Sequence, residues 1–514
     1  MHGGMSWGRM AVGLAALVAA AATLLSGGSG SDLETPTGVL GLPPPFLGIA
    51  VLGDGGLTAA VDAYGNVVDL RAPGPAGRAL IENSAERQAA GTVPSDTGIQ
   101  VWARIDGEML PMWRADEVRQ RYLPGTNVLR TVASFGRDQV QIDEAAGESL
   151  FITVASTTAT EARVNADLSC EQQTSQALTI VCGRSRTHLS PVCGEICVRL
   201  RVAGAANADR RWLNRSLPLG AGAPAWAVDM YERSLLVLRV LTARENGAVA
   251  AGARDGWAYV WPRDASAVAI ALAESGYEPE AERIVQFLLG AGIEFAARFN
   301  GDGSPVHGRE AQGDAIGWVA AASEAAGIGN ARQAAHILAG GGPIPWRDRA
   351  DYWEGEPGDY LGNALASGEP AIDHLYGGKS QPRLVREPGD LDSGLDSAAA
   401  WAVRPFSQPH LYPAARRTME RLVAGRTPFG ITPGEGWEGG DDPWSAPTAW
   451  TAWSLAALGE RPQALQLMQA LRRSATPMGT IPERVDAQTG MPRSTTPLAW
   501  SHAFAILALR ELWP

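Results

Sequence analysis

The chain has 514 residues, 45% of them hydrophobic and 19% charged, a composition typical of folded globular proteins that argues against general disorder. Its 43 basic and 55 acidic residues give a formal net charge of −12, and no basic cluster is interleaved with aromatics. This argues against a nucleic-acid partner and makes a neutral ligand the simplest expectation. The length suffices for two or three domains with substantial cores.

Residues 1–31 have the pattern of an export signal or a short N-terminal membrane anchor. A single basic residue, Arg9, precedes an apolar run at residues 10–25, and small residues follow it. The run is close to the lower length limit for a membrane span. We therefore expect an exported chain, either secreted or tethered to the outer face of the cytoplasmic membrane, and the sequence does not separate the two forms.

Residues 40–210 are predicted to form a β-sandwich domain. Short apolar runs alternate with turn signals such as Gly-Asp-Gly-Gly at 53–56. Many short strands separated by such turns are typical of sandwiches. The strands we expect are 57–61, 67–70, 98–103, 131–134, 150–155, 178–182 and 198–202.

The four cysteines, Cys170, Cys182, Cys193 and Cys197, lie within one short stretch of this domain. An even cluster in an exported chain indicates disulfides, with three possible connectivities, and Cys170–Cys182 with Cys193–Cys197 is the most local choice. A zinc site is the competing interpretation, because Cys193 and Cys197 have tolerable ligand spacing. Neither interpretation concerns catalysis, for which we expect no metal.

The pattern changes near Arg210, and residues 224–514 are predicted to form a helical domain. Apolar residues such as Val228, Tyr231 and Leu235 recur at helical spacing, and another helix is expected to start after the segment Pro279-Glu-Ala-Glu282. Paired helices with long connections indicate a toroid of helical hairpins whose loops carry the site. Further helices are expected at 265–275, 314–326, 329–339, 394–404, 411–424, 446–458, 461–473 and 496–511.

Three aromatics and a charged pair meet in the sequence Trp-Ala-Tyr-Val-Trp-Pro-Arg-Asp. Trp257, Tyr259 and Trp261 would share one face of an extended segment, and Arg263 and Asp264 follow directly. A flat aromatic surface beside such a pair suits a sugar, because the rings cover its C–H face and the charges take its hydroxyls. The alternative is a core strand that ends in a surface ion pair.

Two later loops each hold a glutamate that suits glycoside hydrolysis, which needs one acid to protonate the departing oxygen and one carboxylate to activate water or attack carbon. Glu354 follows Tyr352 and Trp353, which we expect to desolvate it and raise its pKa, as a general acid requires. Glu483 precedes Arg484, which should keep it ionised as a base. Taken singly, each glutamate could be a solvated loop residue.

Four motifs in this order resemble glycoside hydrolase family 15, the glucoamylase-like enzymes. They are Trp-Pro-Arg-Asp, Tyr-Trp-Glu, Gly-Gly-Asp-Asp-Pro-Trp at 439–444, and Pro-Glu-Arg-Val-Asp with a downstream Ala-Trp-Ser-His. The resemblance covers residues 224–514, and the β domain is similar to the sandwich preceding the catalytic domain in bacterial members. It implies an (α/α)6 barrel and an inverting, exo-acting hydrolase that needs no cofactor and releases β-glucose from non-reducing ends of α-glucosides.

The resemblance also implies roles for particular residues. Glu354 matches the general acid and Glu483 the general base, and inversion implies that their carboxyl groups lie roughly 6.5–9.5 Å apart. The arginine and aspartate of the first motif match the pair that grips hydroxyls of the terminal sugar, and nearby tryptophans match its aromatic contacts. The implied substrate-binding residues are Trp257, Trp261, Arg263, Asp264, Trp353 and Trp500.

The sequence also departs from the family pattern. Gly355 follows the acid where many relatives have a second acidic residue, and Trp257 stands where fungal members have tyrosine. These departures leave the linkage open, so trehalase, glucodextranase and isomaltose-type activities of the same family remain alternatives, with a phosphorylase or a non-catalytic glycan-binding protein beyond them. Glu438 is a rival acid that we expect to be structural or to serve an outer subsite, and Asp314 is expected to cap a helix. The segment 355–391 is expected to be a long irregular loop, and the oligomeric state is open.

Overall fold

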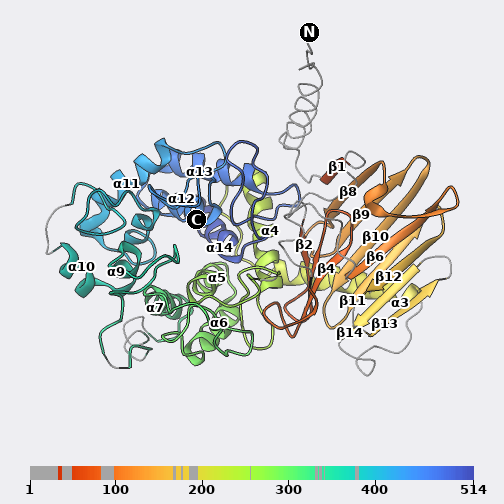
Figure 1. The fold of residues 1–514 in the computed structure, drawn as a ribbon, viewed down its shortest axis with the longest axis horizontal. Coiled ribbons are helices and arrows are strands. Elements are labelled where there is room, and N and C mark those ends of the chain that lie inside the picture. The colour runs from red at the N-terminus through yellow and green to blue at the C-terminus, as the bar shows by residue number, and fades with distance from the viewer. Residues whose placement is uncertain are drawn as a thin grey trace, which may run out of the picture.

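The computed structural model describes residues 33–36, 49–82, 98–165, 169–174, 178–183, 195–254, 256–329, 334, 338–340, 342–376 and 381–514. Strands occupy one side of the molecule and most of the helices the other (Figure 1). Residues 1–31, with the expected signal or anchor, lie outside the described part. Within that part, no helix combines the length and apolar character needed to cross a membrane.

The strands form two antiparallel sheets. The first has the order β1-β8-β9-β10-β11-β14-β13, and the second has the order β12-β6-β4-β3-β2, with β5 paired to β4 and β7 to β6. The strands are β1 (Leu33–Pro36), β2 (Ala50–Leu52), β3 (Thr58–Val61), β4 (Val67–Ala72), β5 (Arg78–Ile81), β6 (Gly98–Ile105), β7 (Glu108–Pro111), β8 (Glu117–Tyr122), β9 (Leu129–Phe135), β10 (Asp138–Ala146), β11 (Leu150–Ser156), β12 (Thr160–Asn165), β13 (Ser169–Thr174) and β14 (Leu178–Gly183).

The two sheets share one hydrophobic core, which makes this region a sandwich, hereafter the sandwich. Along β9, Leu129 and Ala133 are buried while the residues between alternate in exposure, as expected for a strand with one face on a core. Val101 of the second sheet and Val140 and Ile142 of the first belong to the same core. The predicted strands up to residue 182 are thereby confirmed.

Strands β2 and β3 are buried on both faces. Ala50 and Leu52 belong to the core of the sandwich, whereas the intervening Val51, with Ile49 and Ala60, belongs to the core of the helical region. Because successive side chains of a strand point to opposite faces, this part of the second sheet is a wall shared by both regions. Helix α4 (Ala225–Leu241) packs against β2 from the helical side (Figure 1).

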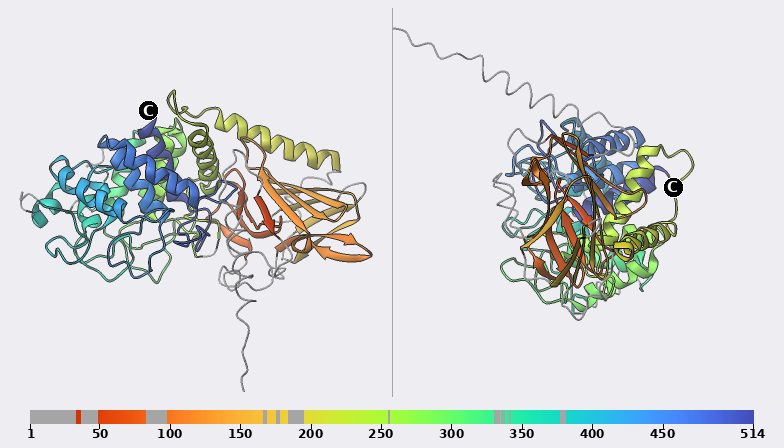
Figure 2. Two further views of the ribbon diagram at one scale, coloured as in Figure 1. Left: turned by 90° about the horizontal axis from the view of Figure 1, so that it is seen from above. Right: turned by 90° about the vertical axis from the view of Figure 1, so that its right-hand side faces the viewer.

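The strand predicted at 198–202 is wrong, because these residues belong to helix α3 (Glu195–Leu213). Val198, Val202 and Ala206 are buried at intervals of four, the helical period, while Leu200 is 67% exposed. A window of five residues with alternating apolar positions does not separate the two periods. The helix lies along the first sheet, against β10, β11 and β14 (Figure 2).

The cysteine prediction lies only partly within the described residues. Cys197, in the first turn of α3, is disulfide-bonded. Cys170 and Cys182 occupy directly opposite positions in the β13–β14 pair. Their side chains and Cys193 lie outside the described residues, so the connectivity stays a prediction.

The helices form a closed ring with further helices packed around it. In the ring, α5 contacts α7, α7 contacts α9, α9 contacts the 3-10 helix η3, η3 contacts α12, α12 contacts α14, and α14 returns to α5. Outside it, α4 packs on α14, α6 on α5, α10 on α9, α11 on η3 and α13 on α12. Their bounds are α5 (Pro262–Glu274), α6 (Glu278–Gly290), α7 (Ala315–Ala325), α9 (Leu361–Ser367), α10 (Glu369–Tyr376), η3 (Ser397–Ala402), α11 (Tyr412–Ala424), α12 (Ser445–Ala457), α13 (Arg461–Ser474) and α14 (Ala499–Leu512).

Most predicted helices are confirmed within a few residues, with three exceptions. The helix predicted at 329–339 falls largely outside the described residues. The one predicted at 394–404 is the short 3-10 helix η3. The segment 355–391 is not an irregular loop, because it contains α9 and α10, whose short length gave no long periodic pattern.

The ring helices are buried over most of their circumference. Every residue of α5 from Pro262 to Leu272 is buried, which is the pattern of an interior helix. Small residues allow the close spacing: an added Cβ at Gly317 of α7 would lie 1.9 Å from the carbonyl oxygen of Ala366 in α9. A methyl group cannot be accommodated there without moving one helix.

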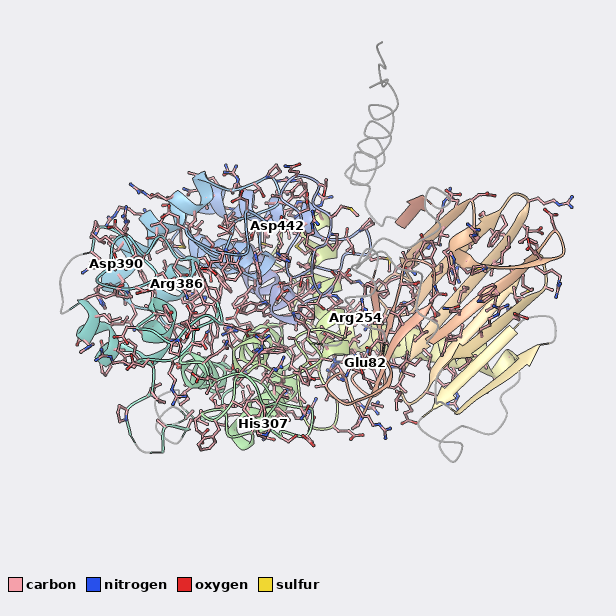
Figure 3. All side chains as sticks on the ribbon, viewed as in Figure 1. Glu82, Arg254, His307, Arg386, Asp390 and Asp442 are labelled. Carbon is pink, nitrogen blue, oxygen red and sulfur yellow. The ribbon has the colours of Figure 1, made fainter. Side chains whose placement is uncertain are left out.

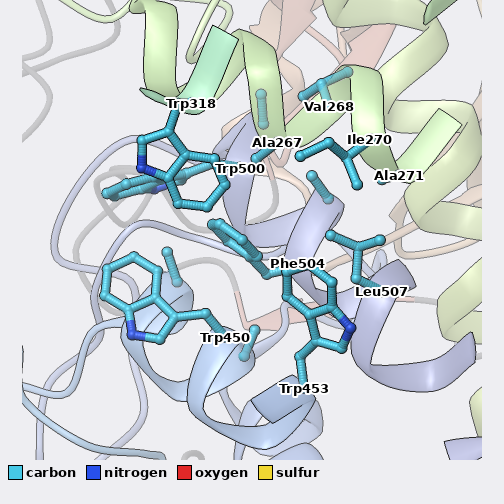
Figure 4. Close-up of a cluster of buried hydrophobic side chains, with 14 of the residues drawn as sticks. Ala267, Val268, Ile270, Ala271, Trp318, Trp450, Trp453, Trp500, Phe504 and Leu507 are labelled. Atoms are coloured by element: carbon cyan, nitrogen blue, oxygen red, sulfur yellow. The ribbon is translucent and has the colours of Figure 1, made fainter. Parts of the chain in front are cut away.

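Tryptophans fill the centre of the ring. Trp401 contacts Trp450 with ring centroids 5.4 Å apart, and Trp450 contacts Trp500 at 5.3 Å. Figure 4 shows Trp450, Trp500 and Phe504 together in this cluster. The chain has 17 tryptophans against 9 phenylalanines. Part of this tryptophan content therefore serves core packing, where large aromatic side chains bury extensive apolar area.

Candidate active site

The N-terminal ends of the ring helices meet at one place. Arg263, in the first turn of α5, pairs with Asp314 at the start of α7, their nearest atoms being 2.9 Å apart. The same guanidinium lies 4.8 Å from the ring centroid of Trp500, in the first turn of α14. Three segments far apart in sequence are thus brought together. Of the predicted glutamates, Glu483 lies in the connection that precedes α14, and Glu354 in the connection that precedes α9.

An indole N–H contacts each predicted catalytic glutamate. Trp257 Nε1 donates to Glu483 Oε1 at 3.2 Å, and Trp261 Nε1 donates to Glu354 Oε1 at 3.1 Å. Trp261 is buried, whereas Trp257 is partly exposed. The two indoles, predicted as sugar contacts, therefore orient the carboxylates, and their contact with sugar stays a prediction.

Arg309 is a site residue that the sequence analysis missed. Its guanidinium forms an ion pair with Glu354, and its charge also acts to lower the pKa of Glu483. Trp257 and Trp261 lie four residues apart and bind Glu483 and Glu354 respectively, which brings the two carboxylates to a single site. The sequence context of Arg309, Gly-Arg-Glu in a polar loop, carries no signal that distinguishes it from a surface arginine.

Glu354 has an unusual backbone conformation. Its φ is 57°, in the left-handed region that few residues other than glycine adopt, and such outliers often occur at functional sites. Its N–H donates to the carbonyl of Asp351 at 2.9 Å, and Gln312 Nε2 lies 3.4 Å from Oε1. Hydrogen bonds therefore hold both the backbone and the side chain of Glu354.

The expected desolvation of Glu354 by the two preceding aromatics is wrong, since its side chain is 30% exposed. Tyr352 points into the core, and its hydroxyl donates to Asp396 at 2.5 Å. Trp353 stacks with the guanidinium of Arg386, 3.7 Å from its ring centroid. Consecutive residues of this tight turn point in different directions, so sequence adjacency gave a misleading picture.

Glu483 is more deeply placed and more fully hydrogen-bonded. Its N–H donates to the carbonyl of Thr495 at 2.9 Å, and the hydroxyl of Ser494 donates to Oε2. Burial raises the pKa of Glu483, and the hydrogen bonds from Ser494 and Trp257 offset this only in part. The charge of Arg484 lowers the pKa of Glu483, as expected, but it does not outweigh the effect of burial. The guanidinium of Arg484 points toward Asp442, with their nearest atoms 3.8 Å apart.

Arg263 and Asp264 are almost fully buried, at 3% and 5% exposure. Arg263 donates to Gln312 Oε1 at 2.8 Å, whereas Asp264 Oδ2 has no hydrogen-bond partner among the described residues and lies 3.7 Å from the guanidinium. Burial raises the pKa of Asp264 to about 7. Asp314 begins α7, as expected, but its side chain makes no cap hydrogen bond and serves the buried arginine instead.

The remaining candidates lie at the edges of the site. Trp500 is 5% exposed and packs in the aromatic core. It contacts the site through the guanidinium of Arg263, which lies over its ring. Trp353 is partly exposed and meets Trp437 edge-on, with centroids 5.0 Å apart. The rival acid Glu438 is exposed, next to that tryptophan.

No family model matches this chain, and no curated protein matches its sequence. Among solved structures, a bacterial glucoamylase in complex with acarbose superimposes with a TM-score of 0.65 at 13% identity, covering 95% of each chain. A wild-type glycosidase gives a TM-score of 0.49 at 20% identity over 56% of this chain and 97% of its own. The glucoamylase from Saccharomycopsis fibuligera gives 0.47 at 14%, over 56% and 94%. The first similarity shows that the chain shares the fold of that glucoamylase, and the other two are too weak to carry an argument.

Proposed function

We propose that this chain is an inverting, exo-acting α-glucosidase of the glucoamylase type, which hydrolyses α-glucosidic bonds at non-reducing ends and releases β-glucose. The observation that carries the proposal is the pair of glutamates, Glu354 and Glu483, each bound by an indole and both within reach of Arg309. Two carboxyl groups with different environments are what glycoside hydrolysis requires.

In this proposal Glu354 is the general acid. It donates a proton to the glycosidic oxygen as the bond to the anomeric carbon breaks. Arg309, which pairs with Glu354 in the free protein, would have to move or exchange its partner when substrate binds. Trp261 keeps the carboxyl group oriented through the hydrogen bond from its indole.

Glu483 is the general base. It takes a proton from a water molecule that attacks the anomeric carbon from the opposite side, which inverts the configuration. A base must be ionised, so the raised pKa of Glu483 predicts that activity is lost at a higher pH on the acidic side than for an ordinary glutamate. The raised pKa also makes the carboxylate a stronger base once it has lost its proton.

The terminal sugar is proposed to bind over Arg263 and Asp264. The unpartnered Oδ2 of Asp264 is a buried acceptor that a sugar hydroxyl can satisfy, and unsatisfied buried acceptors are costly unless a ligand fills them. Trp257 and Trp353 are partly exposed and can present ring faces to the sugar, while Trp261 and Trp500 are buried beneath.

Three broader proposals accompany this one. The closed ring from α5 to α14 is proposed to be the inner layer of an (α/α)6 barrel, which the ring order and its outer helices support. The chain is proposed to belong to glycoside hydrolase family 15. Export remains a proposal supported by the apolar run at 10–25 and by the disulfide-bonded Cys197.

Glucose release from maltose, isomaltose, dextran, trehalose and starch tests the activity and names the linkage. Wild type should hydrolyse at least one of them without phosphate, and Glu354→Gln and Glu483→Gln should each lower kcat by roughly 10²–10⁴-fold or more. Near-normal kcat in either variant removes that residue from its role. Dependence on phosphate would favour a phosphorylase, and binding of glycans without hydrolysis would favour a binding protein.

A further inference from the structure

The base loop, defined as residues 475–483 between α13 and Glu483, reaches into the sandwich. Met478 is 5% exposed and belongs to the hydrophobic core of the sandwich, whose other buried members all lie between Ala50 and Val154. A side chain from the helical region therefore completes the core of the other region.

Polar contacts fix the same loop. The buried hydroxyl of Thr480 lies 3.4 Å from the carbonyl oxygen of Ile49, and 2.6 Å from the hydroxyl of Thr476. Gly479 has a φ of 76°, and an added Cβ there would lie 3.0 Å from Cγ of Arg233. The hydrogen bond between the two threonines therefore closes the turn, and its glycine packs closely against α4.

Arg233 joins this turn to the sandwich. Its guanidinium lies over the ring of Tyr122, 3.8 Å from the centroid, and donates to the carbonyl of Thr126 at 2.9 Å and to Oδ1 of Asn127 at 3.1 Å. These three partners lie at the end of β8 and in the turn that follows it. The loop therefore rests on the sandwich directly and through this arginine.

The anchored turn is followed closely by Glu483. The N–H of Ile481 donates to Nε2 of His502 at 2.9 Å, and the carbonyl of Ile481 accepts from the N–H of Leu498 at 2.9 Å. Burial lowers the pKa of His502 to about 3, so Nε2 stays an acceptor at working pH. The backbone of the base has little freedom between its anchor and its carboxylate.

The turn that carries Trp257 reaches the sandwich as well. Arg254 is 1% exposed, and its carbonyl accepts from the N–H of Trp257 at 3.1 Å. Burial raises the pKa of Asp62 and of Asp69, two buried carboxylates of the sandwich, and the charge of Arg254 offsets part of this rise in each. Figure 3 places Arg254 where the strands and the helices meet.

The acid half of the site is held differently. The described partners of the Glu354 side chain are Trp261, Arg309 and Gln312, all from the helical region. The two halves of the site therefore depend on different parts of the molecule.

We propose that the sandwich is a positioning platform for the water-activating half of the site. The positioning residues are Met478, Thr480 and Arg254. They fix the positions of Glu483 and Trp257 in the site. This role rests on the proposed function, because it assumes that Glu483 is the base.

The test compares full-length Met478→Ala with Val140→Ala, which shortens a buried core residue of β10 whose paired neighbours are Ala133 and Ser156. We expect Met478→Ala to lower kcat about 10- to 100-fold, as for a slightly misplaced catalytic group, with KM changed by less than about threefold. The acidic limb of the pH–activity profile should move to higher pH, because the hydrogen bond from Trp257 to Glu483 weakens. The alkaline limb should keep its position. Val140→Ala should lose stability but keep wild-type kcat and pH profile.

A second pair of variants keeps the test decisive. Met478→Leu keeps the side-chain volume and should restore the wild-type kcat. Thr480→Val removes the hydroxyl without changing the side-chain shape, and it should move the acidic limb upward, as expected for Met478→Ala. It provides the test even if Met478→Ala does not fold. If the folded variants of the base loop match Val140→Ala in kcat and in the acidic limb, the platform role is wrong while the proposed function stands. If the wild type hydrolyses none of the glucosides, the proposed function fails and this role with it.

Discussion

Replacing Trp257 with phenylalanine isolates the hydrogen bond to the proposed base. The ring is kept and the Nε1–H donor, 3.2 Å from Glu483 Oε1, is lost. A hydrogen bond to a charged group contributes about 1.5–3 kcal/mol, and the length of this one favours the lower end. Since one pKa unit corresponds to about 1.4 kcal/mol, Trp257→Phe should raise the pKa of the base by about one unit.

The assay is the pH dependence of kcat/KM, which reports the free protein. The hydrogen bond stabilises the ionised carboxylate, so its loss makes protonation easier and moves the acidic limb upward by about one pH unit. Trp261→Phe is the matched control, because the same donor is removed from Glu354 instead and the acidic limb should stay in place. An acidic limb that stays or moves downward in Trp257→Phe, with the fold intact, would refute the assignment of Glu483 as the base.

Three further predictions concern the base, the sandwich and the ring. Ser494→Ala removes the other donor to the base and should also move the acidic limb upward, measured in the same assay. Glu144 is fully buried, and neither of its carboxylate oxygens has a hydrogen-bond partner among the described residues. Burial raises its pKa well above the ordinary value, so the stability that the protein has at low pH is lost as pH rises. Glu144→Gln should therefore raise the unfolding temperature at pH 8 but not at pH 4, and equal shifts at both pH values would contradict this. Gly317→Ala should lower the free energy of unfolding by about 1–3 kcal/mol in denaturant titration, because the added methyl group would overlap the carbonyl oxygen of Ala366. Gly204→Ala in α3 is the control, because an added Cβ there has no atom within 4 Å. It should leave the free energy of unfolding unchanged or raise it by up to about 1 kcal/mol.

Secondary structure was predictable where one period dominates a long enough segment. β11 begins with the apolar and β-branched run Leu-Phe-Ile-Thr-Val, and α12 is rich in alanine and tryptophan over 13 residues, so both were recognised. The strand predicted inside α3 shows the limit, since Val198, Leu200 and Val202 fit both periods until Ala206 is considered. Helix α9 was missed because it spans 7 residues, too few to show a period.

The candidate site residues could be named from the motifs, but the contacts between them could not be predicted. Glu354, Glu483 and the tryptophans were identified from motif order, but no spacing rule reveals that Trp257 contacts one glutamate and Trp261 the other. Arg309 had no local signal, and Met478 is an ordinary apolar residue in sequence. Their importance comes from tertiary contacts between segments far apart along the chain.

Proton NMR of glucose as it is released tests the central claim most directly. The account predicts that β-glucose appears first from whichever glucoside the wild type hydrolyses, because Glu483 activates water on the side of the sugar opposite the leaving group. The α anomer equilibrates with it only later by mutarotation. If α-glucose appears first, Glu483 does not act as a water-activating base and the inverting mechanism is wrong.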